Sequence, residues 1–291
     1  VLLNCQRKPY QDDPEACEQG KRQWVVIQRS DVQQEGTSNA ARSQYNNFAV
    51  SAGFEQLITP NALFGFAGSY TRSDYSVPER WFSGSSDHVH TSVYGVISAD
   101  NGLGLKAAVI GGVSTNSYTR YAMGNEVNGD FNSASYGAAL EAFYRGQLGN
   151  WYITPFVGAQ TSHLRQSSHE EDDILWGNSY KAESVISRPA SAGFSIERPF
   201  IGEERQLIPR MRYTYRAETA SRERTSTAAS LAAPGYYWTV NAPKADSHEH
   251  RLDLSIKLAQ SRRSHLELQG FRNWSETNES DGAGVNFYYK F

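Results

Sequence analysis

The segment that decides the fold is Asp281-Gly282-Ala283-Gly284-Val285-Asn286-Phe287-Tyr288-Tyr289-Lys290-Phe291, at the end of the chain. Its apolar residues recur at every second position, from Ala283 to Phe291. The positions between them are small or polar, except Tyr288, whose hydroxyl group suits a wet surface. Alternation with a period of two is typical of a β-strand with one apolar and one watery face. The segment is about as long as a tilted strand that crosses a bilayer, so it predicts the last strand of a membrane-spanning β-barrel.

The composition excludes membrane-spanning helices and is compatible with a barrel. Hydrophobic residues make up 39% of the 291 residues, and the mean hydropathy is −0.59. The longest apolar stretch, Ala107–Val113, is far shorter than the ~20 residues that a membrane helix needs. Barrel strands bury only alternate residues, which lowers any hydropathy average. A net charge of −3 gives no reason to expect a nucleic-acid partner.

The rest of the chain repeats one plan, in which a strand, a polar loop, a second strand and a tight turn follow each other. Asp100-Asn101-Gly102 is the strongest hairpin signal. No helical pattern interrupts the strands, which excludes a βαβ fold. The twelve expected strands are about 22–34, 43–58, 63–75, 88–98, 103–117, 133–146, 151–164, 182–199, 205–218, 248–259, 264–274 and 281–291.

The connections alternate in length. Turns after even-numbered strands, such as Gln147–Asn150, have four or five residues, whereas those after odd-numbered strands, such as 122–131 and 220–246, are longer. This asymmetry is typical of bacterial barrels with short periplasmic turns and long outer loops. The sequence therefore predicts an all-β, 12-stranded antiparallel transmembrane β-barrel in the outer membrane. An even number of strands would return Phe291 to the periplasmic side.

The second phase of the strands is charged. On the lipid face, each Arg or Lys near the midplane would cost roughly 2–4 kcal/mol, so these side chains are expected to point into the lumen. A twelve-stranded barrel lies between the filled barrels of eight strands and the open channels of sixteen or more. The expected lumen-lining residues are Glu55, Lys106, Glu141, Arg145, Arg210, Arg212, Arg216, Arg251, Asp253, Lys257, Glu267 and Lys290.

The signals for an enzyme or a metal site are weak. His88 and His90, and likewise His248 and His250, share a strand face with a spacing that suits a metal, but the two pairs fall on strands that are not neighbours. Rim histidines are the preferred interpretation. His169, next to Ser167 and Ser168, resembles an outer-membrane phospholipase motif without an ordered Ser/His/Asn set. We therefore expect no catalytic residue, no metal and no cofactor.

Taken together, these features resemble a known family, the C-terminal translocator (β) domain of monomeric autotransporters. Autotransporters are proteins that are secreted through their own barrel. The resemblance rests on Cys5 and Cys17 shortly before Trp24, on Ala52-Gly53-Phe54-Glu55, on the number of strands, and on the final Val285–Phe291 segment. It implies that the domain anchors an N-terminal passenger and mediates its export to the cell surface. It also implies insertion with the help of the barrel-assembly machinery and periplasmic chaperones, with Val285, Phe287, Tyr289 and Phe291 as the assembly signal.

One feature departs from the family pattern, and a further segment precedes the barrel. The self-cleaving branch carries an Asn-Asn pair in a plugging helix, whereas Asn46-Asn47 falls in the second strand here. Residues 1–21 are expected to form a periplasmic-side segment, followed by the barrel at 22–291. In an oxidising periplasm Cys5 and Cys17 should form a disulfide, with two free thiols as the alternative.

The expected partners are outer-membrane lipid, the chain's own passenger and the assembly factors, with no nucleic acid and a monomeric state. The segment Val1-Leu2-Leu3-Asn4 is not a signal peptide, so the barrel is expected to be the tail of a longer precursor in the Gram-negative outer membrane. Two alternatives remain open at this point, a small-solute channel and an outer-membrane hydrolase.

Overall fold

The computed structural model describes residues 20–291 except 37–40, 203–205, 234, 243 and 260–262. Twelve strands form its wall. They are β1 (Lys21–Gln34), β2 (Ser43–Thr59), β3 (Ala62–Val77), β4 (Phe82–Ser98), β5 (Leu103–Ala122), β6 (Asn125–Tyr144), β8 (Trp151–Gln166), β12 (Pro189–Glu197), β14 (Gln206–Glu218), β17 (His248–Ala259), β18 (Ser264–Ser275) and β19 (Asn278–Lys290).

The remaining elements are short. They are β7 (Gly146–Leu148), β9 (His169–Glu170), β10 (Asn178–Tyr180), β11 (Glu183–Ser187), β13 (Phe200–Ile201), β15 (Arg224–Ser230), β16 (Tyr237–Ala242) and the 3-10 helix η2 (Pro78–Arg80). Within the described ranges, no helix is long and apolar enough to cross a membrane.

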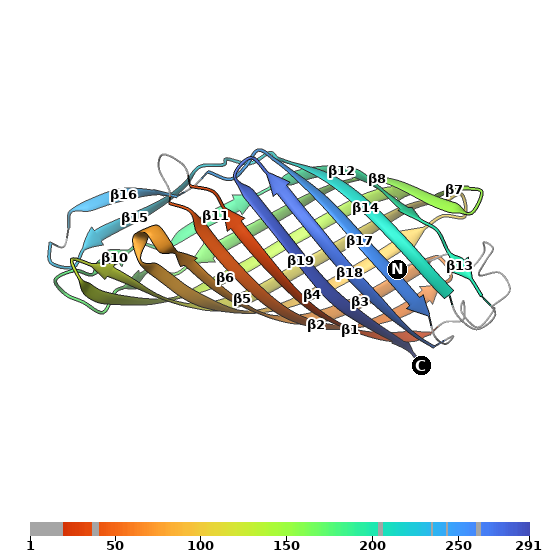
Figure 1. Cartoon of the computed structure of the whole chain (residues 1–291), viewed down its shortest axis with the longest axis horizontal. Coiled ribbons are helices and arrows are strands. Elements are labelled where there is room, and N and C mark those ends of the chain that lie inside the picture. The colour runs from red at the N-terminus through yellow and green to blue at the C-terminus, as the bar shows by residue number, and fades with distance from the viewer. Residues whose placement is uncertain (1–19, 37–40, 203–205, 234, 243, 260–262) are drawn as a thin grey trace.

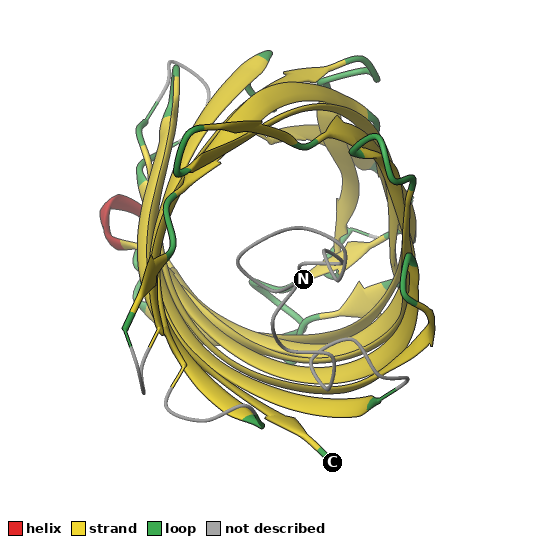
Figure 2. Cartoon of the chain, turned by 90° about the vertical axis from the view of Figure 1, so that its right-hand side faces the viewer, coloured by secondary structure: helices red, strands yellow, loops and turns green. Residues whose placement is uncertain are grey.

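The wall strands form a closed antiparallel ring (Figures 1 and 2). The first and last strands pair from Arg22↔Lys290 to Gln34↔Asn278, and β6 pairs with β8 on the other side. Closure gives every wall strand two neighbours, so the described strands leave no unpaired edge toward lipid, where each unsatisfied backbone group would cost several kcal/mol. The prediction of a twelve-stranded barrel that is closed by the tail segment is confirmed.

The tail segment shows how the outer and inner faces of the barrel wall differ. Val285, Phe287 and Phe291 are exposed outward, whereas Asn286 between them is buried. The same alternation runs through β1, where every second residue is exposed. Apolar side chains on the outside and polar ones on the inside are what a barrel in lipid needs, the reverse of a soluble domain.

The inner face is packed at the end of the barrel where the chain terminates, which we call the turn end. Leu57, Leu63 and Val96 are buried there as one apolar cluster, and Tyr94 packs against it. Glycines let inner aromatic rings lie flat on the wall. A Cβ atom on Gly53 would come within 2.4 Å of the Trp24 ring, so this ring needs a glycine beneath it.

The opposite end, which we call the loop end, differs from the sequence prediction. Residues 122–131 are not a loop, because β5 and β6 stay paired up to Ala122↔Asn125. The hairpin turns at Met123 and Gly124, which both have positive φ. The expected loop around Pro78 is likewise reduced to η2, since β4 already begins at Phe82. The two ends therefore differ because some strands extend beyond the wall and because two connections, 167–182 and 219–247, are long.

The two long connections form a small sheet of their own. Its strand order is β16-β15-β10-β9, and an isolated bridge between Gly129 and Glu171 ties it to β6. The predicted strand at 182–199 is interrupted at Arg188 and forms two strands, β11 and β12. Both pair with β8, and the register is the same on either side of the interruption. The small sheet lies at the loop end in Figure 1.

Candidate functional site

The centre of the inner wall holds a three-residue ion network. The Lys106 ammonium group donates to Glu141 Oε1 at 2.6 Å, and Arg212 donates to Glu141 Oε2 at 2.5 Å. Arg212 lies on β14 and Glu141 on β6, with β8 and β12 between them in the wall. An ion pair that skips two strands must run through the interior of the barrel. The Arg212 guanidinium also lies 3.7 Å from the centre of the Phe156 ring, so an aromatic face supports it.

A second ion pair lies nearer the turn end. Arg145 pairs with Glu197 of β12, and its guanidinium lies over the Tyr152 ring at 4.4 Å. Glu197 and Tyr152 are both buried. Glu197 was not among the expected lumen-lining residues, although its inward phase, opposite to that of Ile196, could have indicated it.

Glu55 is the most buried of the expected lumen residues, with 3% of its surface exposed. Its Oε1 accepts a hydrogen bond from the Tyr94 hydroxyl at 3.0 Å, and that hydroxyl accepts one from Trp24 Nε1 at 2.8 Å. Among the described residues, Glu55 Oε2, Arg210 Nε and Asn286 Oδ1 are buried without a hydrogen-bond partner. The inner wall therefore presents both a negative and a positive group with capacity for further contacts.

The other expected residues form local pairs along the wall. Arg251 pairs with Asp253 at 2.7 Å, and Arg216 pairs with Glu249 at 3.4 Å. Lys257 lies opposite Glu267 in the ladder between β17 and β18, and Lys290 lies opposite Arg22 near the end of the chain. Asp253 lies opposite Arg212 in the ladder between β14 and β17, but its ion pair is with Arg251 on its own strand.

A cavity of about 390 Å³ lies toward the loop end. Its lining includes Val32, Gln160, Arg216, Glu249 and Asn273, which come from five different wall strands. Polar and charged groups of both signs predominate, which favours water or a hydrated polar chain over an apolar ligand.

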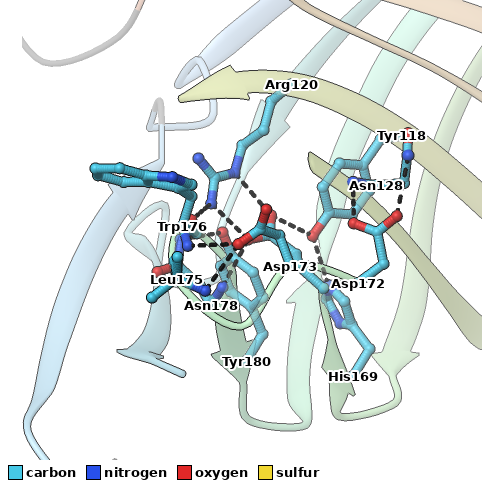
Figure 3. A network of polar contacts seen from close by, with 11 residues as sticks. Tyr118, Arg120, Asn128, His169, Asp172, Asp173, Leu175, Trp176, Asn178 and Tyr180 are labelled. Carbon is cyan, nitrogen blue, oxygen red and sulfur yellow. Dashed lines mark hydrogen bonds and ion pairs between the residues drawn. The ribbon is translucent and has the colours of Figure 1, made fainter. Parts of the chain in front are cut away.

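The loop end also contains a buried carboxylate, Glu171, which was not among the expected site residues (Figure 3). Both oxygens of Glu171 are held by Arg120, at 2.8 Å from Nε and 2.5 Å from Nη2. The Tyr118 hydroxyl donates to Oε1 at 3.0 Å, and the Asn178 backbone N–H donates to Oε2 at 2.7 Å. Such a fork-to-fork arrangement is among the stronger charge-assisted contacts. It fastens the loop after β8 to the extended hairpin of β5 and β6.

Two further groups of this loop carry shifted pKa values. Hydrogen bonds from the Asn128 backbone and side chain hold the pKa of Asp172 below its usual range. Burial lowers the pKa of His169, and the Ser167 backbone and the carboxylates of Glu171 and Asp130 oppose this without cancelling it. His169 stacks on Tyr180 with the ring centres 4.7 Å apart.

The histidines that were considered as metal ligands have other contacts. His90 Nε2 lies 3.1 Å from Ser135 Oγ, and the nearby His88 ring stacks on it. His248 and His250 bond to the hydroxyls of Tyr215 and Tyr213. Within the described ranges, no cluster of three or more His, Cys, Asp or Glu residues could hold a metal ion.

His169 and Ser167, which were considered for a hydrolase, also have hydrogen-bond partners in other parts of the chain. His169 Nε2 lies 3.0 Å from the Tyr118 hydroxyl, and Ser167 Oγ accepts a hydrogen bond from the Asn132 backbone. Cys5 and Cys17 lie outside the described residues, so their expected disulfide stays a prediction.

The barrel is similar to known secretion domains. The translocator domain of the autotransporter NalP from Neisseria meningitidis matches with a TM-score of 0.78 and 13% identity, over 97% of this chain and 93% of that one. The β-domain of the Bordetella autotransporter BrkA matches at 0.68 and 16%, over 94% and 100%. The transport unit of AIDA-I from Escherichia coli matches at 0.60 and 11%, over 100% and 93%. At these identities the likeness shows the fold.

The family assignment comes from the sequence itself. No curated protein matches the chain. The family described as the autotransporter β-domain matches residues 23–270, which is most of the barrel from the start of β1 to the middle of β18. This chain therefore belongs to the autotransporter β-domain family.

Proposed function

We propose that the charged inner wall is the surface along which the passenger crosses the outer membrane. An autotransporter β-domain is an integral outer-membrane translocator that exports an N-terminal passenger, and that is the role of this chain. The finer assignment rests on one observation, the Lys106–Glu141–Arg212 network, in which the Arg212–Glu141 ion pair joins two wall strands that are not neighbours. Charges of both signs on one wall let a passing polar chain exchange contacts without binding tightly to any of them.

The proposed transport surface consists of the twelve inward charges that the sequence predicts, to which we add Glu197 as the partner of Arg145. Seven of the twelve form an ion pair with another side chain of the wall, so much of their charge is compensated locally. A solute channel with strong ion preference would instead need a ring of like charge. This contrast favours a peptide over a selected small ion as the natural occupant.

We further propose that the turn end faces the periplasm and the loop end the cell exterior. In this orientation Val285, Phe287, Tyr289 and Phe291 are presented to the barrel-assembly machinery and its chaperones on the periplasmic side. The domain acts as a monomer, without catalytic residues or a cofactor, and Cys5 is linked to Cys17 in the periplasmic-side segment that precedes the barrel.

Photo-crosslinking of a stalled passenger tests the transport surface. A photoreactive residue at Gln160, which lines the cavity, should crosslink to a passenger that is halted during export, because the passenger shares the lumen with this side chain. The matched control is the same residue at Val157, on the lipid face of the same strand with 61% of its surface exposed. Crosslinks of equal yield from both positions, or from Val157 alone, would contradict the proposal.

A further inference from the structure

The outward face of β18, β19 and β1 carries charges, and the ladder row of Arg29 continues through the outward charges Arg72 of β3 and Asp87 of β4. Arg29 is in the same outward phase as Ile27, and 73% of its side chain is exposed. Arg272 and Asp281, which lie opposite each other on β18 and β19, have exposed fractions of 56% and 64%. We call the outward residues of these three strands the charged sector; the strands lie side by side in Figure 1.

The charges begin directly above an apolar row. Across the three strands, Leu268, Val285 and Ile27 lie opposite one another in the ladder. Four residues farther along, the corresponding positions are Arg272, Asp281 and Asp31. The change from apolar to charged falls within four residues on all three strands, at Arg29 on β1 and one outward position later on β18 and β19, so it is not confined to a single residue.

This boundary leaves the apolar band short. On β1, the only outward residues between Gln23 and Arg29 are Val25 and Ile27, an apolar run of roughly 7 Å along the strand at ~3.3 Å per residue. On β5, every outward position from Leu103 to Val113 is apolar or glycine, which gives a span of roughly 33 Å by the same rise. A tilted strand needs about 9–11 residues to cross the hydrocarbon layer, so β5 meets this requirement and β1 does not.

A short apolar band draws lipid headgroups toward it. An Arg side chain on the lipid face is costly at the midplane and nearly free at the headgroup level. A bilayer next to a band that is too short becomes locally thinner, at a modest cost for each ångström. A headgroup region that reaches Arg29 and Arg272 would keep both guanidinium groups out of the hydrocarbon layer.

The arginines of the charged sector have capacity for a phosphate group. The contact between Arg29 and Asp31 is weak, with 4.0 Å between nitrogen and oxygen. Arg272 has two carboxylate partners, Glu279 at 3.1 Å and Asp281 at 3.8 Å. A guanidinium has five donors in a fork that matches phosphate oxygens. The neighbouring carboxylates can share divalent cations with the same phosphates.

We propose that Arg29 and Arg272 bind the phosphate groups of the phosphorylated glycolipid in the outer leaflet, next to a bilayer that is thinned at the seam between β19 and β1. This inference rests on the proposed orientation, with the loop end facing the cell exterior. The seam is where the first and last strands meet, so the thinned bilayer lies beside the pair of strands that closes the ring.

Spin-label depth measurements test the thinning. Single-cysteine variants with Cys5→Ser and Cys17→Ser carry a nitroxide at Ala283→Cys in the charged sector, or at Val109→Cys on β5 at a similar number of residues from the turn end. In vesicles of phosphatidylcholine with bisphosphorylated lipid A, the label at 283 should lie markedly closer to the headgroups than the label at 109. Equal depths at the two positions would overturn the thinning.

Lipid retention tests the phosphate contact. Native mass spectrometry should show that the barrel retains bisphosphorylated lipid A about tenfold better than its dephosphorylated form, as expected for charge-assisted hydrogen bonds. The R29L/R272L variant should lose this preference, whereas the K244L variant, which removes an exposed loop cation, should keep it. The double variant makes the lipid face more apolar, so insertion should be retained, and heat-modifiable mobility checks this. A preference that survives in R29L/R272L would overturn the contact.

A protease added to intact cells separates this inference from the orientation on which it rests. Cleavage in the loop end places that end outside the cell. Equal label depths together with such cleavage would overturn only the lipid inference. Protection of the loop end from the protease would overturn both the orientation and the lipid inference.

Discussion

The closing strand β19 and the network around Glu171 are stabilised by different interactions. β19 is held by two complete ladders, to β18 and β1, and by a row of side chains in lipid. The loop that carries Glu171 is held mainly by side-chain contacts to Arg120, Tyr118 and Asn128. Damage to β19 should therefore affect insertion of the whole barrel, whereas damage to the Glu171 network should open one loop and leave the barrel closed.

The largest effect is expected for a charge on the lipid face of β19. Phe287→Arg places a cation among exposed apolar side chains and should cost roughly 2–4 kcal/mol of stability in the membrane. Urea unfolding in vesicles and heat-modifiable mobility measure the loss. Lys290→Ala, in the other phase of the same strand, should have little effect. If Lys290→Ala proves the more damaging of the two, the assignment of the faces is wrong.

A smaller effect is expected for the central ion network. Glu141→Leu removes the shared carboxylate and leaves the positive charges of Lys106 and Arg212 close together, at a cost of about 1–3 kcal/mol. The same unfolding measurement applies. Glu79→Leu, in the exposed helix η2, is the matched control and should be neutral. Combining Glu141→Leu with Lys106→Met should recover part of the loss, and a double variant less stable than the single one would show that repulsion between the two cations is not the cause.

The effect on the loop should be local. Glu171→Gln keeps the shape of the side chain but removes the charge that Arg120 contacts at both oxygens, which should lower the free energy of local opening of this loop by roughly 1–2 kcal/mol. Limited proteolysis should cut residues 167–182 faster, while global unfolding stays unchanged. Glu170→Gln, the neighbouring exposed carboxylate, serves as control. A change in global unfolding would mean that the loop and the wall are coupled.

The same contrast explains what could be predicted from the sequence. Strands in a barrel have one face in lipid and the other in the interior, so Phe287 and Asn286 reveal the fold by their alternation alone. The number of strands and the closing tail followed from this pattern. The extension of β5 and β6 to Ala122 and Asn125 did not, because strands beyond the membrane have no lipid face and lose the alternation.

The side-chain partners were harder to predict for another reason. The inward phase of Glu141 and Arg212 could be assigned, but their pairing depends on which strands lie across the lumen, which the order of residues does not contain. Glu171 was passed over because it lies in a run of acidic residues, 170–173, in which composition does not distinguish the buried carboxylate from the solvated ones.

The smallest effect is expected for the pH dependence of the loop, through His169. Burial lowers the pKa of His169 below its usual value, so its neutral form is favoured in the folded loop. A group whose folded pKa is depressed contributes stability above its unfolded pKa, here about 6.5, and that contribution is lost as the pH falls through the folded pKa. Asp172, whose pKa is also lowered, acts in the same direction only below about pH 4.

Proteolysis of residues 167–182 should therefore accelerate modestly between pH 6.5 and 5, before Asp172 titrates. The His169→Phe variant keeps the stacking on Tyr180 and removes the titrating group, so its cleavage rate should be flat over this range once the protease's own pH dependence is subtracted. An equal acceleration in His169→Phe would assign the pH dependence to another group.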